Sequence, residues 1–309
     1  MSTDPKHVFV AGATGVVGLP AVRALLADGH HVTAVARSPE KAAAVRALGA
    51  EPIAVDLFDA AAVKEATAGH DVVVNLATRI PPTAKAWRAG AWEENERIRR
   101  EVSAHLADAA LDHGAERYVQ EALAFAYADH GEDWIDEAEP LDPPAGLEGV
   151  LTAEASARRV TDAGAAGVVL RFGNFYGPAA AHTHDTLRLA RRRISATLGP
   201  VDAHWSVVHT DDAGAAVAAA LTVPAGAYNV VDDRPLRRRE HDLAIAHAVG
   251  VGDLRLPPKP VRRLAESRAE ILTRSIRASN RKLTAASSWA PTYPSAHEGW
   301  LAVADALRR

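Results

Sequence analysis

The chain has 309 residues, of which 48% are hydrophobic and 24% charged, and this suits one large α/β domain or two closely joined ones. The formal net charge is −4 at pH 7 and no run of like charges stands out, which argues against nucleic acid or an acidic membrane surface as a partner. The chain contains no cysteine, which excludes disulfides, thiolate nucleophiles and thiolate metal ligands.

The N-terminal segment MSTDPKHVFVAG lacks the basic stretch and apolar run of a signal peptide. No stretch of about 20 uninterrupted apolar residues occurs anywhere in the chain, so we expect no membrane span. These features predict a cytoplasmic protein.

In the first half of the chain, short β-branched runs alternate with helical segments. Strands are predicted at 7–12, 31–36, 52–57, 71–77, 117–120 and 167–172. Helices are predicted at 16–27, from Ser38 (an N-cap followed by proline) onward, at 92–113 and near 148–164. This alternation predicts an α/β fold, a Rossmann doubly wound parallel sheet covered by helices on both faces.

After residue 175 the alternation loosens. We expect a Rossmann dinucleotide-binding domain over 1–177, to which 205–231 returns with two strands. Segments 178–204 and 232–309 are expected to form a smaller substrate-binding cap of helices and loops. A substrate should then lie between sheet and cap, at the carboxyl ends of the strands.

The segment VAGATGVVG follows the first strand and opens the first helix, and it supplies Gly12, Gly15 and Gly18. The first glycine allows a tight turn, the second lets the backbone approach a pyrophosphate, and the third lets helix and strand pack closely. The N-terminus of the helix offers free N–H groups to the phosphates. The segment therefore predicts a dinucleotide site.

The end of the second strand indicates which dinucleotide is bound. An NAD site places an acidic residue here, whereas this chain has Arg37, with Lys41 one turn later. A guanidinium can pair with a 2′-phosphate in bidentate fashion, so we expect NADP(H). The alternative is that Arg37 is a solvated surface side chain. Asp56, after the third strand, could bind the adenine amino group or cap the helix at 59–68.

Several segments, in this order, resemble the extended short-chain dehydrogenases/reductases, the NAD-dependent epimerase/dehydratase group and its atypical relatives. They are the glycine turn, ARSPEK (36–41), VDLFD (55–59), VVNLAT (73–78), LRFGNFYGP (170–178), VVHTDDAGAAVAAAL (207–221) and YNVVDD (228–233). The resemblance covers nearly the whole chain and places residues 172–176 beside the nicotinamide. The residues expected to contact the cofactor are Gly12, Thr14, Gly15, Val16, Val17, Gly18, Arg37, Lys41, Asp56, Leu57, Ala77, Thr78, Phe172, Gly173, Asn174 and Phe175.

The catalytic residues that the resemblance implies are missing. Members of that family use Tyr-x-x-x-Lys on the helix after the fifth strand and a Ser or Thr at the end of that strand. Here Val150 stands at the Tyr position, Glu154 at the Lys position, and Ala122 or Leu123 at the hydroxyl position. No lysine occurs between Lys85 and Lys259.

These losses leave two interpretations: hydride transfer by another proton route, or cofactor binding without chemistry. General acid catalysis is worth roughly 10²–10⁴-fold, and a substrate that supplies its own acid can dispense with it. A ketone beside a phenolic hydroxyl does so, and the chain resembles the angucyclinone ketoreductases of aromatic polyketide biosynthesis. We therefore expect an NADPH-dependent ketoreductase acting on a polycyclic aromatic ketone. The alternatives are an inactive NADP(H)-binding regulator and an NADP-dependent epimerase or dehydratase.

Four side chains are weak catalytic candidates, each with a more ordinary alternative. Glu121 could act as a base, or be a surface carboxylate at a helix end. Tyr127 could reach a substrate oxygen, or make an apolar contact with the cap. Glu154 could titrate near the nicotinamide ribose, or face solvent. Tyr176 lies in the loop after the sixth strand.

The remaining expectations concern ligands and partners. The substrate loops are expected at Thr78–Pro82 and Phe172–Tyr176, and three tryptophans could stack on a flat ligand or belong to the core: Trp87, Trp92 and Trp205. No metal site is expected, because the spacing of the histidines at 182, 184, 204 and 209 suits no ligand set. Asp211 is expected to cap a helix. The protein should be a monomer or homodimer.

Overall fold

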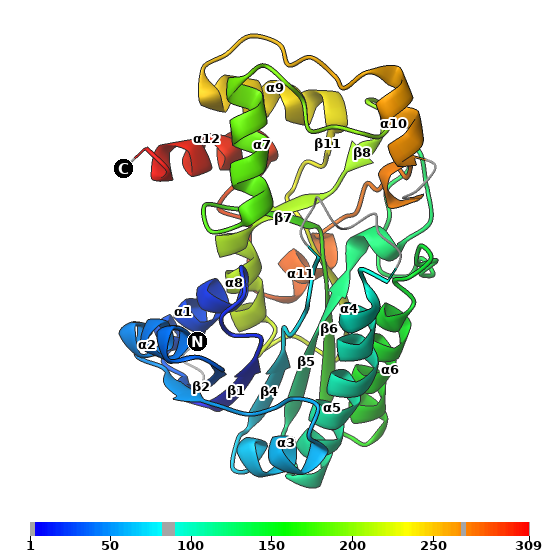
Figure 1. The fold of residues 1–309 in the computed structure, drawn as a ribbon. Coiled ribbons are helices and arrows are strands. Elements are labelled where there is room, and N and C mark those ends of the chain that lie inside the picture. Colours follow the sequence, from blue (N-terminus) through cyan, green and yellow to red (C-terminus); the bar gives the residue numbers. More distant parts are fainter. Residues whose placement is uncertain (1–3, 82–89, 267–269, 309) are drawn as a thin grey trace.

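A computed structural model describes residues 4–81, 90–266 and 270–308, so Pro82, Lys85 and Trp87 lie outside the described residues. The centre of the molecule is a seven-stranded sheet in the order β10-β6-β5-β4-β1-β2-β3 (Figure 1). Its strands are β1 (His7–Ala11), β2 (His31–Val35), β3 (Glu51–Ile53), β4 (Val72–Asn75), β5 (Arg117–Leu123), β6 (Ala166–Phe172) and β10 (Gly226–Val230). Every neighbouring pair is parallel, which confirms the predicted doubly wound sheet.

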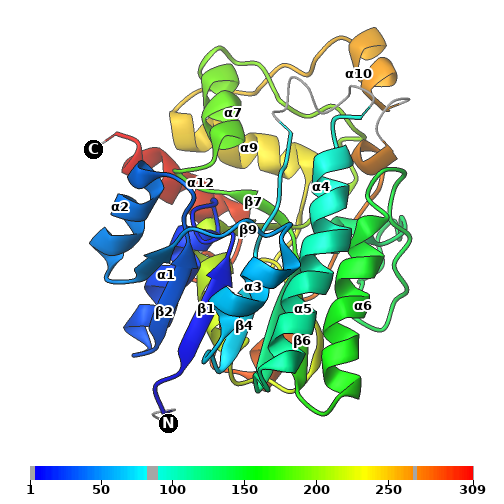
Figure 2. The same ribbon diagram turned by 60° about the horizontal axis from the view of Figure 1, so that its bottom comes forward.

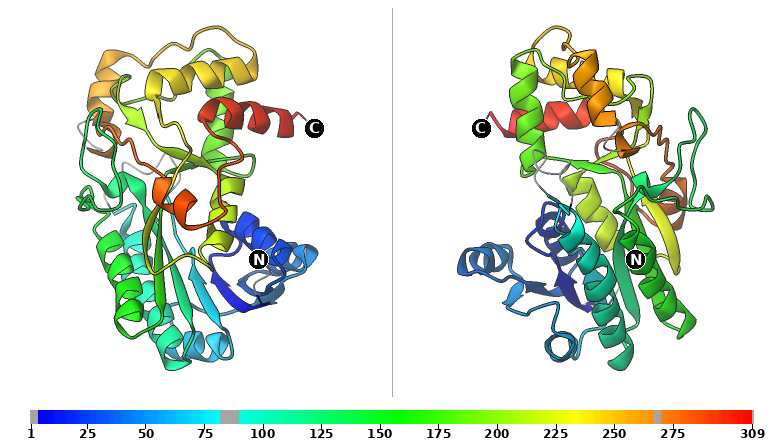
Figure 3. Two further views of the ribbon diagram at one scale, coloured as in Figure 1. Left: turned by 180° about the vertical axis from the view of Figure 1, so that it is seen from behind. Right: turned by 45° about the vertical axis from the view of Figure 1, so that its right-hand side comes forward.

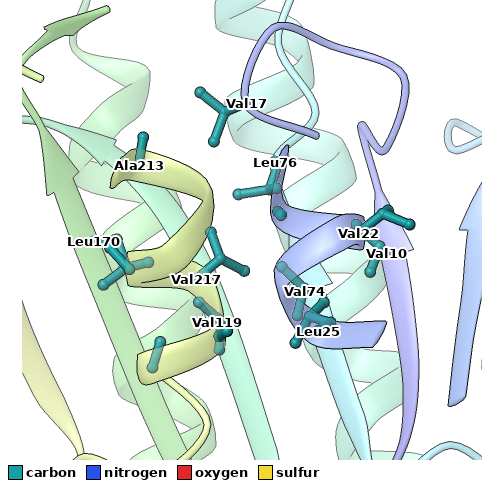
Figure 4. Packing of buried hydrophobic residues seen from close by; sticks show 14 of the residues in the cluster. Val10, Val17, Val22, Leu25, Val74, Leu76, Val119, Leu170, Ala213 and Val217 are labelled. Atoms are coloured by element: carbon teal, nitrogen blue, oxygen red, sulfur yellow. The ribbon is translucent and has the colours of Figure 1, made fainter. Parts of the chain in front are cut away.

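Most strands carry apolar residues on both sides, which explains why helices cover both faces of the sheet. One face is covered by α1 (Gly18–Ala27), α2 (Pro39–Leu48) and α8 (Thr210–Ala219). Figure 4 shows Leu25 on α1 and Val217 on the neighbouring α8 over this face. The other face is covered by α3 (Ala60–Thr67), α5 (Ser103–Asp112) and α6 (Gly149–Asp162), as Figure 2 shows.

The predicted helix at 92–113 is interrupted. It consists of α4 (Glu93–Arg97), a π-helical turn (Ile98–Val102, η1) and α5. A π turn shifts the side chains that follow it around the helix axis, and such turns are frequent at functional sites. The fifth strand, β5, also runs three residues beyond the predicted end, to Leu123.

The N-terminal caps of three helices were predicted, and the structure confirms one of them and differs at the other two. Ser38 Oγ accepts a hydrogen bond from the N–H of Lys41, as expected for the N-cap of α2. Asp59, and not Asp56, caps α3. His209, and not Asp211, caps α8, because its imidazole accepts the N–H of Asp211. In both cases the capping residue lies two or three positions from the expected one, where another polar side chain takes the free N–H groups.

Apart from α8, β10 and α11 (Arg281–Ala286), which pack with the central sheet, most segments after the sixth strand form a second layer beyond its carboxyl edge (Figures 1 and 3). Its core joins α7 (Ala181–Arg191), α9 (Arg238–Val249) and α12 (Ala296–Ala306). Small strands link it to the body: β7 (Asn174–Tyr176) with β9 (Val207–His209), and β8 (His204–Trp205) with β11 (Leu236–Arg237). The surface also carries α10 (Lys259–Glu266), while Leu283 of α11 packs into the core of the sheet.

No helix within the described part of the chain is both long and apolar enough to span a bilayer.

Candidate functional site

The glycine turn between β1 and α1 has the geometry that its residues predict. Gly12 has a φ of +76°, and a Cβ there would lie 2.3 Å from the carbonyl oxygen of Leu76. A Cβ on Gly18 would lie 2.3 Å from the carbonyl oxygen of Gly12. A Cβ on Gly15 would meet nothing closer than 3.2 Å. Gly12 and Gly18 are therefore required by the fold, whereas Gly15 leaves its side of the turn open to a ligand.

A cleft runs from this turn along the carboxyl edge of the sheet, past the ends of β2 and β4. The N-cap of α1, Val17, offers no capping side chain. Pro20 carries no N–H, and the N–H of Leu19 donates to the carbonyl oxygen of Gly15 at 3.4 Å, so within the first turn of α1 it is the N–H of Gly18 that is available to an anion. The cleft is lined by Gly12, Thr14, Gly15, Val35, Arg37, Lys41, Leu57, Phe58, Leu76, Ala77, Thr78, Ile98 and Val102.

The charge of this cleft is positive at the end of β2. Arg37 and Lys41 both line it, and none of its lining residues is an aspartate or glutamate. This fits the 2′-phosphate of NADP(H) better than the two ribose hydroxyls of NAD(H). Asp56 does not line the cleft; its carboxylate accepts the N–H of Phe58 at 3.0 Å.

A second recess adjoins the cleft on the side of β5 and β6. It is lined by Gly12, Gly15, Val16, Val17, Gly18, Leu76, Thr78, Glu121, Phe172 and Phe175. Gly173 and Asn174 do not line it. A Cβ on Gly173 would lie 2.9 Å from the carbonyl oxygen of Ser206, and the N–H of Asn174 donates to that oxygen. These two residues join the sheet to β9, so the expectation that they contact the cofactor remains untested.

Glu121 is the one charged residue that lines this recess, and the surface location considered for it is wrong. Its side chain is buried and accepts two hydrogen bonds from Nη2 of Arg99, at 2.8 and 3.0 Å. Burial raises the pKa of the Glu121 carboxyl, and the facing guanidinium opposes part of that rise.

Glu154 does not face solvent, and Tyr127 does not make a purely apolar contact. Glu154 forms a bidentate pair with Arg171, with both N–O distances 2.8 Å. Arg171 also donates to the hydroxyl oxygen of Tyr127, which in turn donates to the side-chain oxygen of Asn229. Burial raises the pKa of Tyr127 to about 12. This buried network joins α6, β6 and β10, and neither Glu154 nor Tyr127 lines the recess.

Tyr176 packs into the core of the second layer and does not line the recess. Its ring stacks on Trp300 with centroids 5.1 Å apart, and its hydroxyl occupies the space where a Cβ on Gly299 would stand. Burial raises the pKa of Tyr176 well above its ordinary value. A packing role follows from these contacts.

The histidines and tryptophans have separate surroundings. The imidazoles of His182 and His184 face the backbone carbonyls of Phe175 and Pro178. Among the residues that the structure describes, no three potential metal-ligating side chains come together. The guanidinium of Arg238 lies 4.6 Å from the ring centroid of Trp205, and Trp92 packs against the core of the sheet.

Sequence patterns did not single out three buried polar residues that the structure places near the recess. Asn95, Glu96 and Arg99 are all less than 7% exposed. A signal was available, because Arg99 lies on the same helical stripe as the apolar Val102 and Leu106, where a charged residue is out of place.

Comparisons with known proteins agree with this geometry. A family model described as NAD(P)H-binding matches residues 12–176. A "3-diazoavenalumate denitrifying reductase" of Streptomyces sp. is 36% identical over 95% of this chain and 98% of its own length. A quinoline-oxide ketoreductase of Stigmatella aurantiaca ("4-hydroxy-2-methyl-3-oxo-4-farnesyl-3,4-dihydroquinoline-1-oxide ketoreductase") is 42% identical over 23% of this chain and 21% of its own.

Solved structures show the same fold. A human epimerase family protein solved with NADPH superposes with a TM-score of 0.80 at 22% identity, over 97% of this chain and 99% of that one. The UDP-glucose 4-epimerase of Thermus thermophilus, solved with NAD, superposes with a TM-score of 0.75 at 22% identity, over 98% of this chain and 99% of that one. The chain therefore belongs to the NAD(P)H-binding family, has the fold of the extended short-chain dehydrogenases/reductases, and is an NAD(P)-dependent oxidoreductase.

Proposed function

We propose that the protein is an NADPH-dependent ketoreductase that reduces a ketone on a polycyclic aromatic polyketide without a proton donor from the protein. One observation carries this proposal. The cofactor cleft is intact, while the positions of the family's catalytic residues hold a fully buried valine, Val150, and a carboxylate, Glu154, committed to Arg171.

The chain's own residues suit such a cofactor. Arg37 and Lys41 would hold the 2′-phosphate, and the open N-terminus of α1 would hold the pyrophosphate. Phe172 and Phe175 line the recess beside Gly18 and so would exclude water from the reacting carbon. Bound NADPH supplies hydride.

The proton then comes from the substrate. The ketone carbon gains the hydride and its C–O π bond breaks, while the oxygen takes a proton from a phenolic hydroxyl on a neighbouring ring carbon. The resulting phenolate regains a proton from water. The internal hydrogen bond is stronger in an apolar recess, because charge interactions grow as the local dielectric falls.

A second candidate reaction is favoured by the reductase that matches over nearly its whole length. In a hydride-for-diazo exchange, hydride adds to the carbon that carries the diazonium group, the C–N bond breaks, and dinitrogen leaves with the electron pair of that bond. No oxygen needs a proton in this step, so a site without Tyr and Lys is equally suited to it.

The test compares substrates with one protein. Wild-type protein is mixed with NADPH and either 8-hydroxy-1-tetralone or its 8-methoxy analogue, and in a separate assay with a hydroxyaryl diazonium salt while evolved dinitrogen is measured. The ketoreductase proposal expects NADPH loss with the hydroxy ketone and much slower loss with the methoxy ketone. Equal rates with both ketones would refute substrate assistance. Dinitrogen release matched to NADPH loss would favour the second reaction, and tight NADPH binding without turnover of any substrate would favour a regulator.

A further inference from the structure

The first turns of the α4–η1–α5 segment (Glu93–Asp112) present buried polar side chains to the body of the protein. Asn95, Glu96 and Arg99 lie on this face, followed by the apolar Val102 and Leu106. Several of their polar atoms are buried and have no hydrogen-bond partner within the described residues: Nδ2 of Asn95, Oε1 of Glu96, and Nε and Nη1 of Arg99.

The partnered atoms of the same side chains show where this face lies. Asn95 accepts the N–H of Arg79, in the loop after β4, at 2.9 Å. Glu96 accepts the N–H of Gly149, at the start of α6, at 2.5 Å. Arg99 donates to Glu121 at the end of β5. The three side chains therefore lie among segments that meet at the carboxyl edge of the sheet, and Arg99 reaches the recess through Glu121, which lines it.

Arg99 also lies beside the position of the missing tyrosine. A Cβ on Gly149 would stand 3.1 Å from Cβ of Arg99, and Val150 is the next residue. The side chain of Arg99 thus runs from the start of α6 to the end of β5, between the places that the tyrosine and the hydroxyl residue hold in the family.

Buried donors without acceptors are rare in native proteins because they lose their hydrogen bonds to water without replacement. The guanidinium of Arg99 donates through Nη2 alone, so its Nε–H and Nη1–H groups lack a hydrogen-bond acceptor within the described residues. Two observations point to a ligand here: unpartnered atoms on three neighbouring side chains, and a π turn at Arg99 that sets its direction.

Resting on the proposed reductase function, we propose that Arg99 binds a substrate oxygen, carbonyl or phenolate, at or beside the carbon that is reduced. Glu121 is its positioning residue, since it holds Nη2 and so directs Nε–H and Nη1–H. A guanidinium does not give up its proton in proteins, so Arg99 would stabilise negative charge on the oxygen without acting as an acid. This would account for a site that keeps hydride chemistry without the Tyr and Lys.

The test removes both buried charges together, because an Arg or Glu left alone in the interior would destabilise the fold. The variant is Arg99→Gln/Glu121→Gln. The matched control is Arg97→Gln/Glu101→Gln, which removes an exposed ion pair of the same helical segment. Thermal unfolding and NADPH titration come first. Both variants are expected to bind NADPH within about threefold of wild type, because Arg99 and Glu121 are proposed to act on the substrate and the control pair is exposed.

The direct readout is the absorption of a bound phenol. 8-Hydroxy-1-tetralone is titrated into each protein with NADP⁺, so that no reduction occurs. Wild type and the control should shift the bound phenol towards its phenolate spectrum at a pH where the free compound is neutral, and the double variant should not. Absence of the shift in wild type, or its persistence in the double variant, would overturn the role of Arg99.

Turnover is measured separately, which keeps this inference distinct from the function on which it rests. With a substrate that wild type reduces, kcat of the double variant should fall by about 10²-fold or more, as when an oxyanion donor is removed. If the phenolate shift depends on Arg99 but wild type reduces no ketone, the reductase assignment fails and the oxygen site stands. If the double variant does not fold, Arg99→Lys is used in its place. That variant keeps the charge but loses the planar fork, so it should bind the phenolate more weakly and reduce kcat, and unchanged values would overturn the inference.

Discussion

Restoring the family's lysine should destabilise the protein and should not assist catalysis. The substitution is Glu154→Lys. In the native protein Glu154 accepts from Nε and Nη2 of Arg171, and the two side chains are only 7% and 9% exposed. The new ammonium would therefore lie against a guanidinium in a site with little solvent, and Arg171 would lose its buried counter-charge.

The magnitude follows from this geometry. Breaking a buried ion pair by removing one partner costs about 3–5 kcal/mol, and the like charge adds to that cost. Domains are stable by only about 5–15 kcal/mol, so the variant should lose about a fifth of its stability or more. At roughly 2–4 °C for each kcal/mol in a large domain, Tm should fall by about 6–20 °C. Adding Val150→Tyr, to complete the pair, would overfill a fully buried position and cost about 1–3 kcal/mol more.

Thermal and urea denaturation followed by circular dichroism would measure the effect. Asp162→Lys is the matched control, because it makes the same charge change at an exposed position of α6 and should alter stability by no more than about 0.5 kcal/mol. Arg171→Glu in the Glu154→Lys background should recover part of the loss. The reasoning would be refuted if Glu154→Lys were as stable as wild type, or if Val150→Tyr/Glu154→Lys raised turnover by about 10²-fold, the scale of general acid catalysis.

Three further outcomes are expected. Arg37→Asp should weaken NADPH binding by about 10- to 150-fold, from the roughly 1.5–3 kcal/mol of a charged hydrogen bond, and should leave NADH binding equal or better. Equal affinity of wild type for both cofactors in a fluorescence titration would contradict the assignment. Gly18→Ala should lower Tm because its Cβ meets the backbone of Gly12, whereas Gly15→Ala should keep Tm and raise the Kd for NADPH. The reverse pattern in melting and binding assays would contradict the roles given to the two glycines. Burial lowers the pKa of His241 to about 3, so the folded state keeps this imidazole neutral, while the unfolded chain binds a proton below about pH 6.5. The free energy of unfolding should therefore fall as the pH drops from 6.5 towards 3, by about 2 kcal/mol at pH 5. In urea titrations at pH 7.5 and 5, the free energy of unfolding of His241→Leu should fall correspondingly less than that of wild type.

Features set by local backbone chemistry could be predicted from the sequence. Spacing of apolar runs indicated a parallel sheet, and the glycine triplet indicated a turn in which Gly12 and Gly18 are sterically required and Gly15 is open. Residue type alone also determined that no Tyr–Lys pair exists, and that Arg37 replaces the acid of an NAD site. None of these conclusions depends on which distant segments contact one another in the folded protein.

The partners of Glu121, Glu154 and Tyr127 depended on tertiary structure. Register places Ala122 of β5 opposite Arg171 of β6, and from there Arg171 reaches both Glu154 of α6 and Tyr127. Arg99 likewise meets Glu121 only because the helix between β4 and β5 packs against the sheet edge. A charged residue's role depends on what compensates its burial, and here the compensating group lies 17 to 44 residues away along the chain. The residues next to a carboxylate in the sequence do not reveal such a distant partner. Glu121 and Glu154 could therefore be recognised as buried and paired only from the tertiary structure.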